Sequence, residues 1–379
     1  MAKAEVQGFV HDKFEGVRDQ FQTHLDTGAD IGASFCVTKD GETVVDLWGG
    51  HADVEKTRAW EKDTIVNVYS TTKTMTALTA LLLADRGELD FDAPVAKYWP
   101  EFAANGKADI KVSHLMSHSA GLSGWREPIT NEDLYDWEKA TSLLAAQAPL
   151  WEPGSAPGYH AITQGYLVGE VIRRVAGKTV GTVFREEIAG PLGADFHIGL
   201  PASEDARVAD LKPPADASIS ADPTLTDIKR VTLTNPGIDV SETRTRAWRG
   251  AEIPAAGGTG NARSVATIHT ILANGGMANG KRFMSEAGCR KALEEQIQGT
   301  DLILGIPVRY GLGFGLSGPM SPALNEHSMF WGGYGGSIAL IDMESHTTMS
   351  YAMNLMQGTT TGDMRAITLA MQAWQGLNA

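Results

Sequence analysis

A serine and a lysine in this chain have a spacing that suits nucleophilic catalysis. Ser70 and Lys73 form a Ser-x-x-Lys sequence, and no other serine has a lysine at that offset. Residues three apart on a helix share a face, so Lys73 could reach the Ser70 hydroxyl. A buried ammonium loses its proton readily, which would let Lys73 act as a base near neutral pH. A chain of this length holds about one such match by chance, so the pair depends on its context.

The context of Ser70 favours a reactive position. A β-like run, Ile65–Ser70, gives way there to a helical pattern. Backbone N–H groups at a helix N-terminus point outward and stabilise a developing oxyanion. The alternative is that Ser70 only caps the helix, as serines often do.

Two further segments carry groups that this chemistry would use. A turn rich in Pro and Gly leads to Tyr159, whose phenol could relay a proton between a serine and a lysine; a packed core ring is the alternative. The glycine-rich run Phe330–Ser337 would allow close approach of the backbone to a ligand. One N–H from this run and that of Ser70 could form an oxyanion hole, whereas a plain turn is the alternative.

Other candidate constellations are weaker. The Gly-x-Ser-x-Gly elbow of α/β-hydrolases is absent. His114 and His118 have a spacing that could place both imidazoles on one helix face, but the glutamate of His-Glu-x-x-His and a third ligand are missing. A structural role is therefore favoured over zinc, and a Ser–His–Asp triad on His118 stays open. Asp90 and Asp92 are interpreted as a solvated loop, so we predict no metal and no cofactor.

The elements around these residues place strands towards both ends of the chain and helices in the middle. Apolar spacing predicts a helix over about Val10–Leu25, a hairpin of residues 31–38 and 43–49, and a helix after Ser70. It also predicts helices at 165–175, 262–273 and 364–374, and short strands at 329–331, 337–341 and 347–353. The polar segment 199–246 is irregular, as binding loops or plain insertions are. This order lacks a βαβ rhythm and favours an α+β fold.

Composition restricts the partners and the compartment. With 32 Lys+Arg against 46 Asp+Glu, the 379-residue chain has a formal net charge of −14, which argues against nucleic-acid and anionic-membrane partners. Two cysteines, Cys36 and Cys289, are too few for a disulfide framework. The N-terminus has no signal-peptide pattern, and the longest apolar run is too short to cross a bilayer. We expect a cytoplasmic protein that acts on a small molecule.

In this order and separation, the three segments resemble the serine β-lactamase and penicillin-binding-protein superfamily. They are more closely similar to the family VIII carboxylesterases, which share the class C β-lactamase fold. The resemblance runs through most of the chain. His114–Leu122 is similar to the family's Leu-Leu-x-His-x-Ser-Gly-Leu segment, and Tyr159–Glu170, Ala247–Ala256 and Gly257–Arg263 match as well.

The resemblance implies a fold and a division into domains. The fold would be α+β, with an antiparallel sheet flanked by helices beside an all-helical domain. Residues 1–85 and 295–379 would form the sheet domain. Residues 86–294 would form the mainly helical domain, with a long polar loop at about 199–246 and the active site between the two domains.

The resemblance also implies roles for the candidate residues. Ser70 would be the acylated nucleophile, and Lys73 and Tyr159 the pair that removes its proton and protonates the leaving group. Which of the two is the immediate base stays open. The N–H groups of Ser70 and Tyr334 would form the oxyanion hole, and Trp331, Gly332 and Gly333 would bind substrate.

Two departures from the β-lactamases bear on the substrate. Those enzymes carry Tyr-x-Asn and Lys-Thr-Gly, whereas this chain has Ala161 in the first motif and Trp331-Gly332-Gly333 in the second. The chain thus lacks an amide that would bond a substrate amide and a cation that would pair with a substrate carboxylate. We expect an esterase for small uncharged esters. Acyl transfer, weak β-lactam or amide hydrolysis, and a penicillin-binding module are the alternatives, and the oligomeric state is open.

Overall fold

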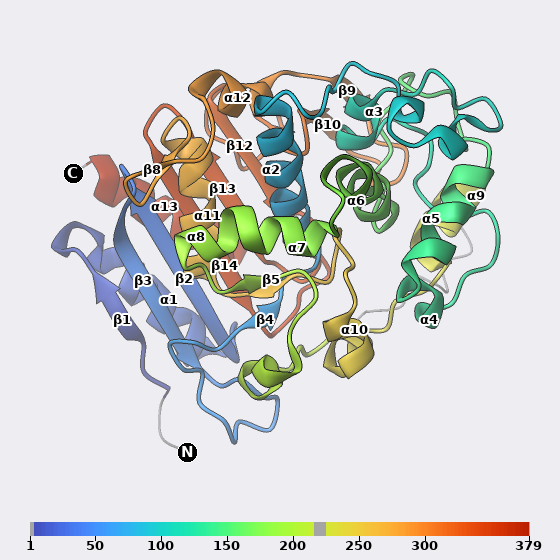
Figure 1. The fold of residues 1–379 in the computed structure, drawn as a ribbon. Coiled ribbons are helices and arrows are strands. Elements are labelled where there is room, and N and C mark those ends of the chain that lie inside the picture. The colour runs from blue at the N-terminus through green and yellow to red at the C-terminus, as the bar shows by residue number, and fades with distance from the viewer. Residues whose placement is uncertain (1–3, 216–224, 379) are drawn as a thin grey trace.

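The computed structural model describes residues 4–215 and 225–378. The main element of this part of the chain is a nine-stranded antiparallel sheet (Figure 1). The strand order is β1 (Gln7–Val10), β3 (Glu42–Gly50), β2 (Gly32–Lys39), β14 (Thr347–Met353), β13 (Ile338–Asp342), β12 (Ser328–Gly332), β11 (Gly315–Leu316), β10 (Pro307–Tyr310) and β9 (Ile297–Thr300). β2 pairs with β14 from Ala33 opposite Met353 to Lys39 opposite Thr347. The two ends of the chain therefore build one sheet.

Helices cover both faces of this sheet. α11 (Ala262–Ala273) packs on β2, β13 and β14, and its first residue donates a backbone hydrogen bond to the Ser34 hydroxyl. Successive side chains of a strand point to opposite faces, so Phe35 faces away from α11. Tyr351 is paired with Phe35 and lies under Arg365 of α13 (Met364–Asn378). α13 and α1 (Glu15–Thr27) pack together and cover this second face.

A buried helix, α2 (Thr72–Asp85), starts directly after Ser70. Its side chains are buried from Thr72 to Leu83, so neighbours must cover it on all sides. α6 (Thr163–Ala176), α7 (Val180–Phe184) and α12 (Glu286–Arg290) contact it. The other helices are α3 (Val112–Met116), α4 (Asn131–Leu134), α5 (Trp137–Ala146), α8 (Gly190–Leu192), α9 (Asp227–Thr234) and α10 (Arg246–Gly250).

Two small sheets complete the described strands. β4 (Val66–Asn67), β6 (Thr259–Gly260) and β5 (Phe196–His197) form one, and β7 (Met277–Ala278) and β8 (Lys281–Arg282) form the other. β4 pairs with β6 two residues before the turn that carries Ser70. This pairing anchors the chain just ahead of that turn.

Most predicted elements are confirmed, and two boundaries were wrong. The β-like run Ile65–Ser70 is a strand only at Val66–Asn67 and ends in a 3₁₀ turn at Tyr69–Thr71. The hairpin, the helices α2, α6, α11 and α13, and the strands β12 to β14 form as expected. The first helix begins at Glu15, whereas Val10 lies in β1 opposite Val45 and Phe14 closes a short 3₁₀ turn. Val10 and Phe14 are nevertheless buried, so the apolar spacing reflected burial rather than helical conformation.

The strands β9 to β11 and the helices within 199–246 were not predicted from the sequence. β9 to β11 are short and interrupted by glycine and proline, so they lack a clear period of two. The polar segment contains α9 and two 3₁₀ helices, Ala202–Arg207 and Val240–Arg244, while residues 216–224 lie outside the described residues.

The observed architecture confirms the α+β class with an antiparallel sheet flanked by helices. The division into a sheet domain and a helical domain stays a prediction. No helix within residues 4–215 and 225–378 is long and apolar enough to cross a membrane.

Candidate active site

Ser70 lies in a tight turn whose backbone is held in an unusual conformation. The turn is a 3₁₀ helix, Tyr69–Thr71, directly before α2. Tyr69 has a φ of 43°, a value that residues other than glycine rarely adopt. The preceding Asn67 is anchored on both sides of its amide: its nitrogen donates to the Ala256 carbonyl (3.0 Å) and its oxygen accepts from the Trp248 indole (2.8 Å). These bonds stabilise the strained turn, in which Ser70 contacts Lys73 and Tyr159.

Lys73 is buried among four oxygen acceptors. Its Nζ lies 3.0 Å from Ser70 Oγ and 3.1 Å from the Tyr159 hydroxyl. It also lies 2.7 Å from the Ala161 carbonyl and 3.0 Å from that of Ala255. Within the described residues no carboxylate accepts from it, and burial lowers its pKa well below the usual lysine value.

Tyr159 completes the group with a short hydrogen bond to Ser70. Its ring packs against both His118 (centroids 5.2 Å apart) and Trp331 (5.9 Å), which are stacked on each other (5.0 Å). Burial raises the pKa of the phenol to about 12, and the charge of Asp301 acts in the same direction, whereas hydrogen bonding to Ser70 lowers it. The phenol is therefore protonated at neutral pH. The structure thus brings Ser70, Lys73 and Tyr159 together, as the sequence predicted.

His114 and His118 do not share a helix face. α3 ends at Met116, and His118 follows in a left-handed conformation with a φ of 58°. Its Nδ1 accepts the His160 N–H (3.1 Å) and its Nε2 lies 3.4 Å from the Gln164 amide, so neither nitrogen faces Ser70 for a triad. Burial lowers its pKa well below the usual value, which makes it a neutral wall beside Tyr159. No group of three metal-ligating side chains is found in the described part of the chain.

The glycine-rich segment meets the Ser70 turn at the end of β12. A Cβ at Gly333 would lie 2.2 Å from the Val68 carbonyl and 2.3 Å from Ser337 Oγ, so only glycine fits. Ser337 Oγ donates to that same Val68 carbonyl (2.8 Å) and lies 3.0 Å from the Thr71 hydroxyl. These contacts join the two turns that would supply the oxyanion donors. Among the backbone hydrogen bonds of the described residues, none uses the N–H of Ser70 or of Tyr334.

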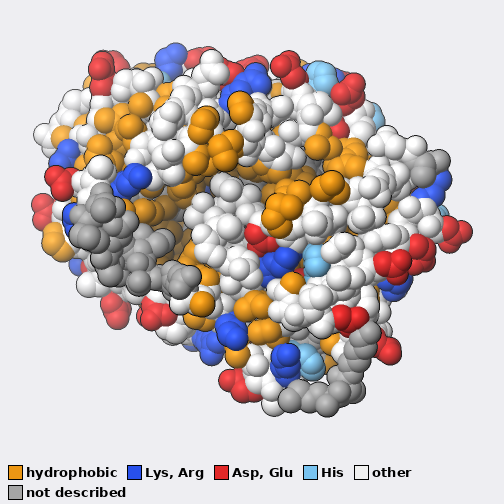
Figure 2. Space-filling view, turned by 180° about the vertical axis from the view of Figure 1, so that it is seen from behind, with side chains coloured by type: hydrophobic (Ala, Val, Ile, Leu, Met, Phe, Trp, Pro, Cys, Tyr) orange, Lys and Arg blue, Asp and Glu red, His pale blue; other side chains and the backbone are white. Residues whose placement is uncertain are grey.

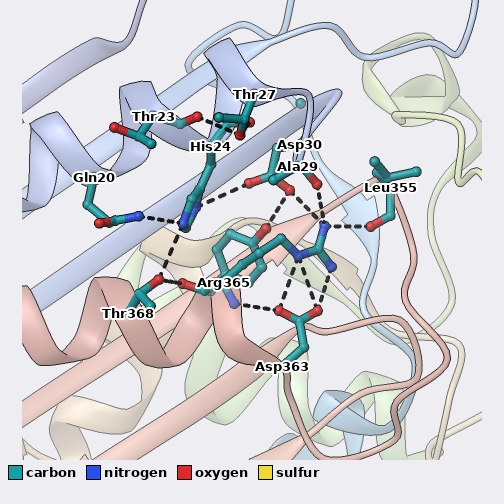
Figure 3. Close-up of polar contacts among 12 residues, drawn as sticks. Gln20, Thr23, His24, Thr27, Ala29, Asp30, Leu355, Asp363, Arg365 and Thr368 are labelled. Carbon is teal, nitrogen blue, oxygen red and sulfur yellow. Dashed lines mark hydrogen bonds and ion pairs between the residues drawn. The ribbon is translucent and has the colours of Figure 1, made fainter.

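Arg365 joins the glycine-rich turn to a buried ion cluster with Asp30 and Asp363 (the cluster is shown in Figure 3). Its Nη2 donates to the Gly335 carbonyl (2.9 Å) and pairs with Asp363 Oδ2 (2.5 Å). Its Nη1 donates to Asp30 Oδ1 (2.8 Å), and the Tyr351 hydroxyl donates to the same oxygen (2.6 Å). A buried ion cluster thereby fixes the carbonyl next to Tyr334.

Sequence reasoning missed Asp301, which links Tyr159 to the loop between β9 and β10. Its carboxylate is buried, and Oδ1 accepts the N–H of Tyr159 (3.1 Å), Ile303 (2.8 Å) and Leu304 (2.9 Å). Oδ2 accepts the Tyr310 hydroxyl (3.1 Å). The local signal was an aspartate followed by a turn, which is typical of a side chain that bonds its own loop. The bond to Tyr159, far away in the sequence, left no such signal.

An apolar cavity of about 370 Å³ lies beside Tyr159. Its walls come mainly from β9 to β12 and the segments next to them: Leu304, Ile306, Pro307, Val308, Leu316, Pro319, Met320, Phe330 and Trp331 are the large apolar residues. The cation at its edge, Arg309, is paired with Glu295. Of the three predicted substrate-binding residues, Trp331 and Gly332 line this cavity, while Gly333 packs under the Ser70 turn.

The chain belongs to the Beta-lactamase family, whose model matches residues 17–372. The Esterase/beta-lactamase LipL of Mycobacterium tuberculosis is 37% identical over 340 residues, which are 85% of this chain and 77% of that protein. Among solved structures, a family VIII carboxylesterase superposes with a TM-score of 0.94 at 42% identity, over 98% of this chain and 100% of the other. A penicillin-binding protein homologue from Caulobacter crescentus superposes with 0.92 at 36% identity, over 98% and 100%.

These similarities confirm the resemblance to the family VIII carboxylesterases. They also confirm that the protein is an enzyme of the serine ester hydrolase type. The roles of the individual residues follow from the geometry and are proposals.

Proposed function

We propose that the protein hydrolyses small uncharged carboxylic esters through an acyl-enzyme on Ser70. One observation carries this assignment: the buried Lys73 amine lies within hydrogen-bonding distance of both the Ser70 and Tyr159 hydroxyls, and none of its contacts with the described residues is to a carboxylate. A nucleophile, a neutral base and a protonated acid are thereby in mutual contact.

Lys73 is the immediate base in this scheme. A neutral amine has two N–H groups and one lone pair, and the carbonyls of Ala161 and Ala255 accept both N–H groups. The lone pair is left for the Ser70 proton. Tyr159, whose pKa is raised by burial to about 12, is a proton donor rather than the base.

Acylation of Ser70 then proceeds with two linked proton transfers. Ser70 Oγ attacks the carbonyl carbon while its proton passes to Lys73, and the new oxyanion accepts the N–H groups of Ser70 and Tyr334. As the C–O bond to the alcohol breaks, Tyr159 protonates the leaving oxygen and regains a proton from Lys73. Water replaces the alcohol for deacylation, and the same proton path runs in reverse.

The lining of the site supports a neutral substrate. Trp331 occupies the position where β-lactamases have a lysine, and Ala161 occupies the position where they have an asparagine. The cavity is mainly apolar, and its lining arginine, Arg309, is paired with Glu295. LipL carries both esterase and β-lactamase in its name, so hydrolysis of a β-lactam is the second candidate. The lack of a cation for the β-lactam carboxylate makes it the slower reaction.

The experiment is hydrolysis of short aryl esters by the parent and by Ser70→Ala, followed in parallel with intact-protein mass and a chromogenic cephalosporin. We expect Ser70→Ala to lose about 10⁴-fold or more in kcat, as removal of a nucleophile typically does, with unchanged thermal unfolding. Residual hydrolysis by a clean mutant preparation at more than about one-tenth of the parent rate would contradict the proposal.

We further propose that the partners are small molecules and that the protein acts in the cytoplasm. The net charge of −14 supports the first point. The free, buried thiols of Cys36 and Cys289 agree with a reducing compartment.

A further inference from the structure

A second groove continues the cavity beside Tyr159. It has a volume of about 640 Å³, is more open than the cavity, and runs along the start of α13. Met320, Ser321 and Thr361 line both spaces. A chain that fills the cavity beside Tyr159 therefore has room to extend into the groove.

The groove is mainly apolar, and the polar side chains among its described lining residues are those of Ser321, Gln357, Thr359 and Thr361, besides one ion pair. Pro322, Ile367 and two exposed methionines, Met320 (64% exposed) and Met364 (67%), contribute most of its apolar wall. Figure 2 shows hydrophobic side chains gathered around a hollow on the face opposite to that of Figure 1. The charged lining residues in the described chain, Asp363 and Arg365, are paired with each other (Figure 3). An ionic headgroup would find no partner here.

We propose that this groove is an extension subsite that lets the enzyme take, beyond the small esters of the proposed function, uncharged esters with one longer unbranched hydrocarbon chain whose far end lies in the groove. The inference rests on the proposed function, because the chain would be attached to the ester that Ser70 attacks. Methionine side chains are flexible and adapt to such chains. The shared walls support this occupant, since a chain that extends from the cavity past Met320 and Thr361 enters the groove.

The expected effect follows from the hydrophobic gain per methylene. Each fully buried CH₂ contributes about fourfold to binding. A ten-carbon chain has about six more methylenes than a four-carbon chain. If about three of these lie half covered in the open groove, the groove alone contributes roughly tenfold to the long-to-short ratio of kcat/KM.

The test compares esters of matched length with the parent, Met364→Asp and Met371→Asp. Met371 is the control, because it lies on the same helix with similar exposure (55%) but lines neither space. One arm places the long chain in the acid (ethyl decanoate against ethyl butyrate), and the other places it in the alcohol (decyl acetate against butyl acetate). All esters are kept below the concentration at which they aggregate.

We expect Met364→Asp to lower the long-to-short ratio of kcat/KM by about tenfold in one of the two arms, and Met371→Asp to leave the ratio at the parent value. The arm that responds assigns the groove to the acyl or the alcohol side. Equal ratios for the three proteins in both arms, with short esters still hydrolysed, would overturn the subsite and leave the proposed function standing. Loss of short-ester hydrolysis by the parent would instead overturn the proposed function.

Discussion

Two buried cations in this protein have opposite surroundings. Lys73 is 1% exposed, and its contacts are two hydroxyls and two carbonyls. Arg365 is 7% exposed and lies between the carboxylates of Asp30 and Asp363. Burial lowers the pKa of Lys73, whereas for Arg365 the groups Tyr351, Asp363 and Asp30 outweigh burial and raise it.

The difference separates a reactive cation from a structural one. A buried amine without a counter-charge exists as the neutral base, and it can accept the Ser70 proton. A guanidinium between two carboxylates keeps its charge, and its fork of donors holds the Gly335 carbonyl. Both sites thus contribute to one reaction: Lys73 accepts a proton, and Arg365 holds the glycine-rich turn in place.

The largest expected effect comes from removing the uncompensated amine. Lys73→Met should lower kcat for a short aryl ester by about 10²–10⁴-fold, as loss of a general base does. The free energy of unfolding should change by no more than about 1–3 kcal/mol, because two carbonyls lose a donor while a buried amine is removed. Steady-state kinetics and urea unfolding measure both quantities. A kcat above about one-tenth of the parent value would remove Lys73 from the role of base.

Arg365→Met should have the opposite effect, with a large loss of unfolding free energy and a small loss of kcat. Two buried carboxylates would lose their cation, which typically costs about 3–5 kcal/mol of unfolding free energy, while kcat falls only about tenfold. Burial already raises the pKa of Asp30 to about 6 in the parent protein, above its ordinary value of 3.8. Loss of the Arg365 charge should raise this pKa further, so Asp30 takes up its proton at higher pH in the variant than in the parent, and the deficit should shrink as the pH falls from 8 towards 6. A deficit that is constant between pH 5 and 8 in urea unfolding would contradict this account.

A smaller effect is expected at Asp301, which acts on Tyr159 only through hydrogen bonds and charge. Asp301→Ala should lower kcat for a short ester by about tenfold with little change in KM, because the Tyr159 N–H loses its acceptor. Asp301→Asn keeps an oxygen at that position and should restore most of kcat. If the asparagine variant were as slow as the alanine variant, the acceptor would not be the feature that matters.

The sequence predicted the candidate catalytic residues better than the residues that hold them in position. Ser70 and Lys73 are three residues apart, so local helix geometry was enough to bring them together, and motif order added Tyr159. Asp301 and Arg365 act through contacts with residues distant in sequence, at Tyr159 and Gly335, and no local pattern reports such a contact. The same reason explains the strands. β12 to β14 are continuous β-like runs of five to seven residues, whereas β9 to β11 have two to four residues each and join the sheet through the pairing of β11 with β12.

The charge state of Lys73 is the most direct test of this comparison. Protein labelled with ¹³C at the lysine Cε carbons can be titrated by NMR, and the resonance missing from Lys73→Met identifies Lys73. We predict that this resonance titrates well below the ordinary lysine value of 10.5, and that kcat/KM rises with pH through the same midpoint as the neutral amine forms. A midpoint at or above 10.5 would show a charged lysine at neutral pH and would contradict the assignment of Lys73 as the base.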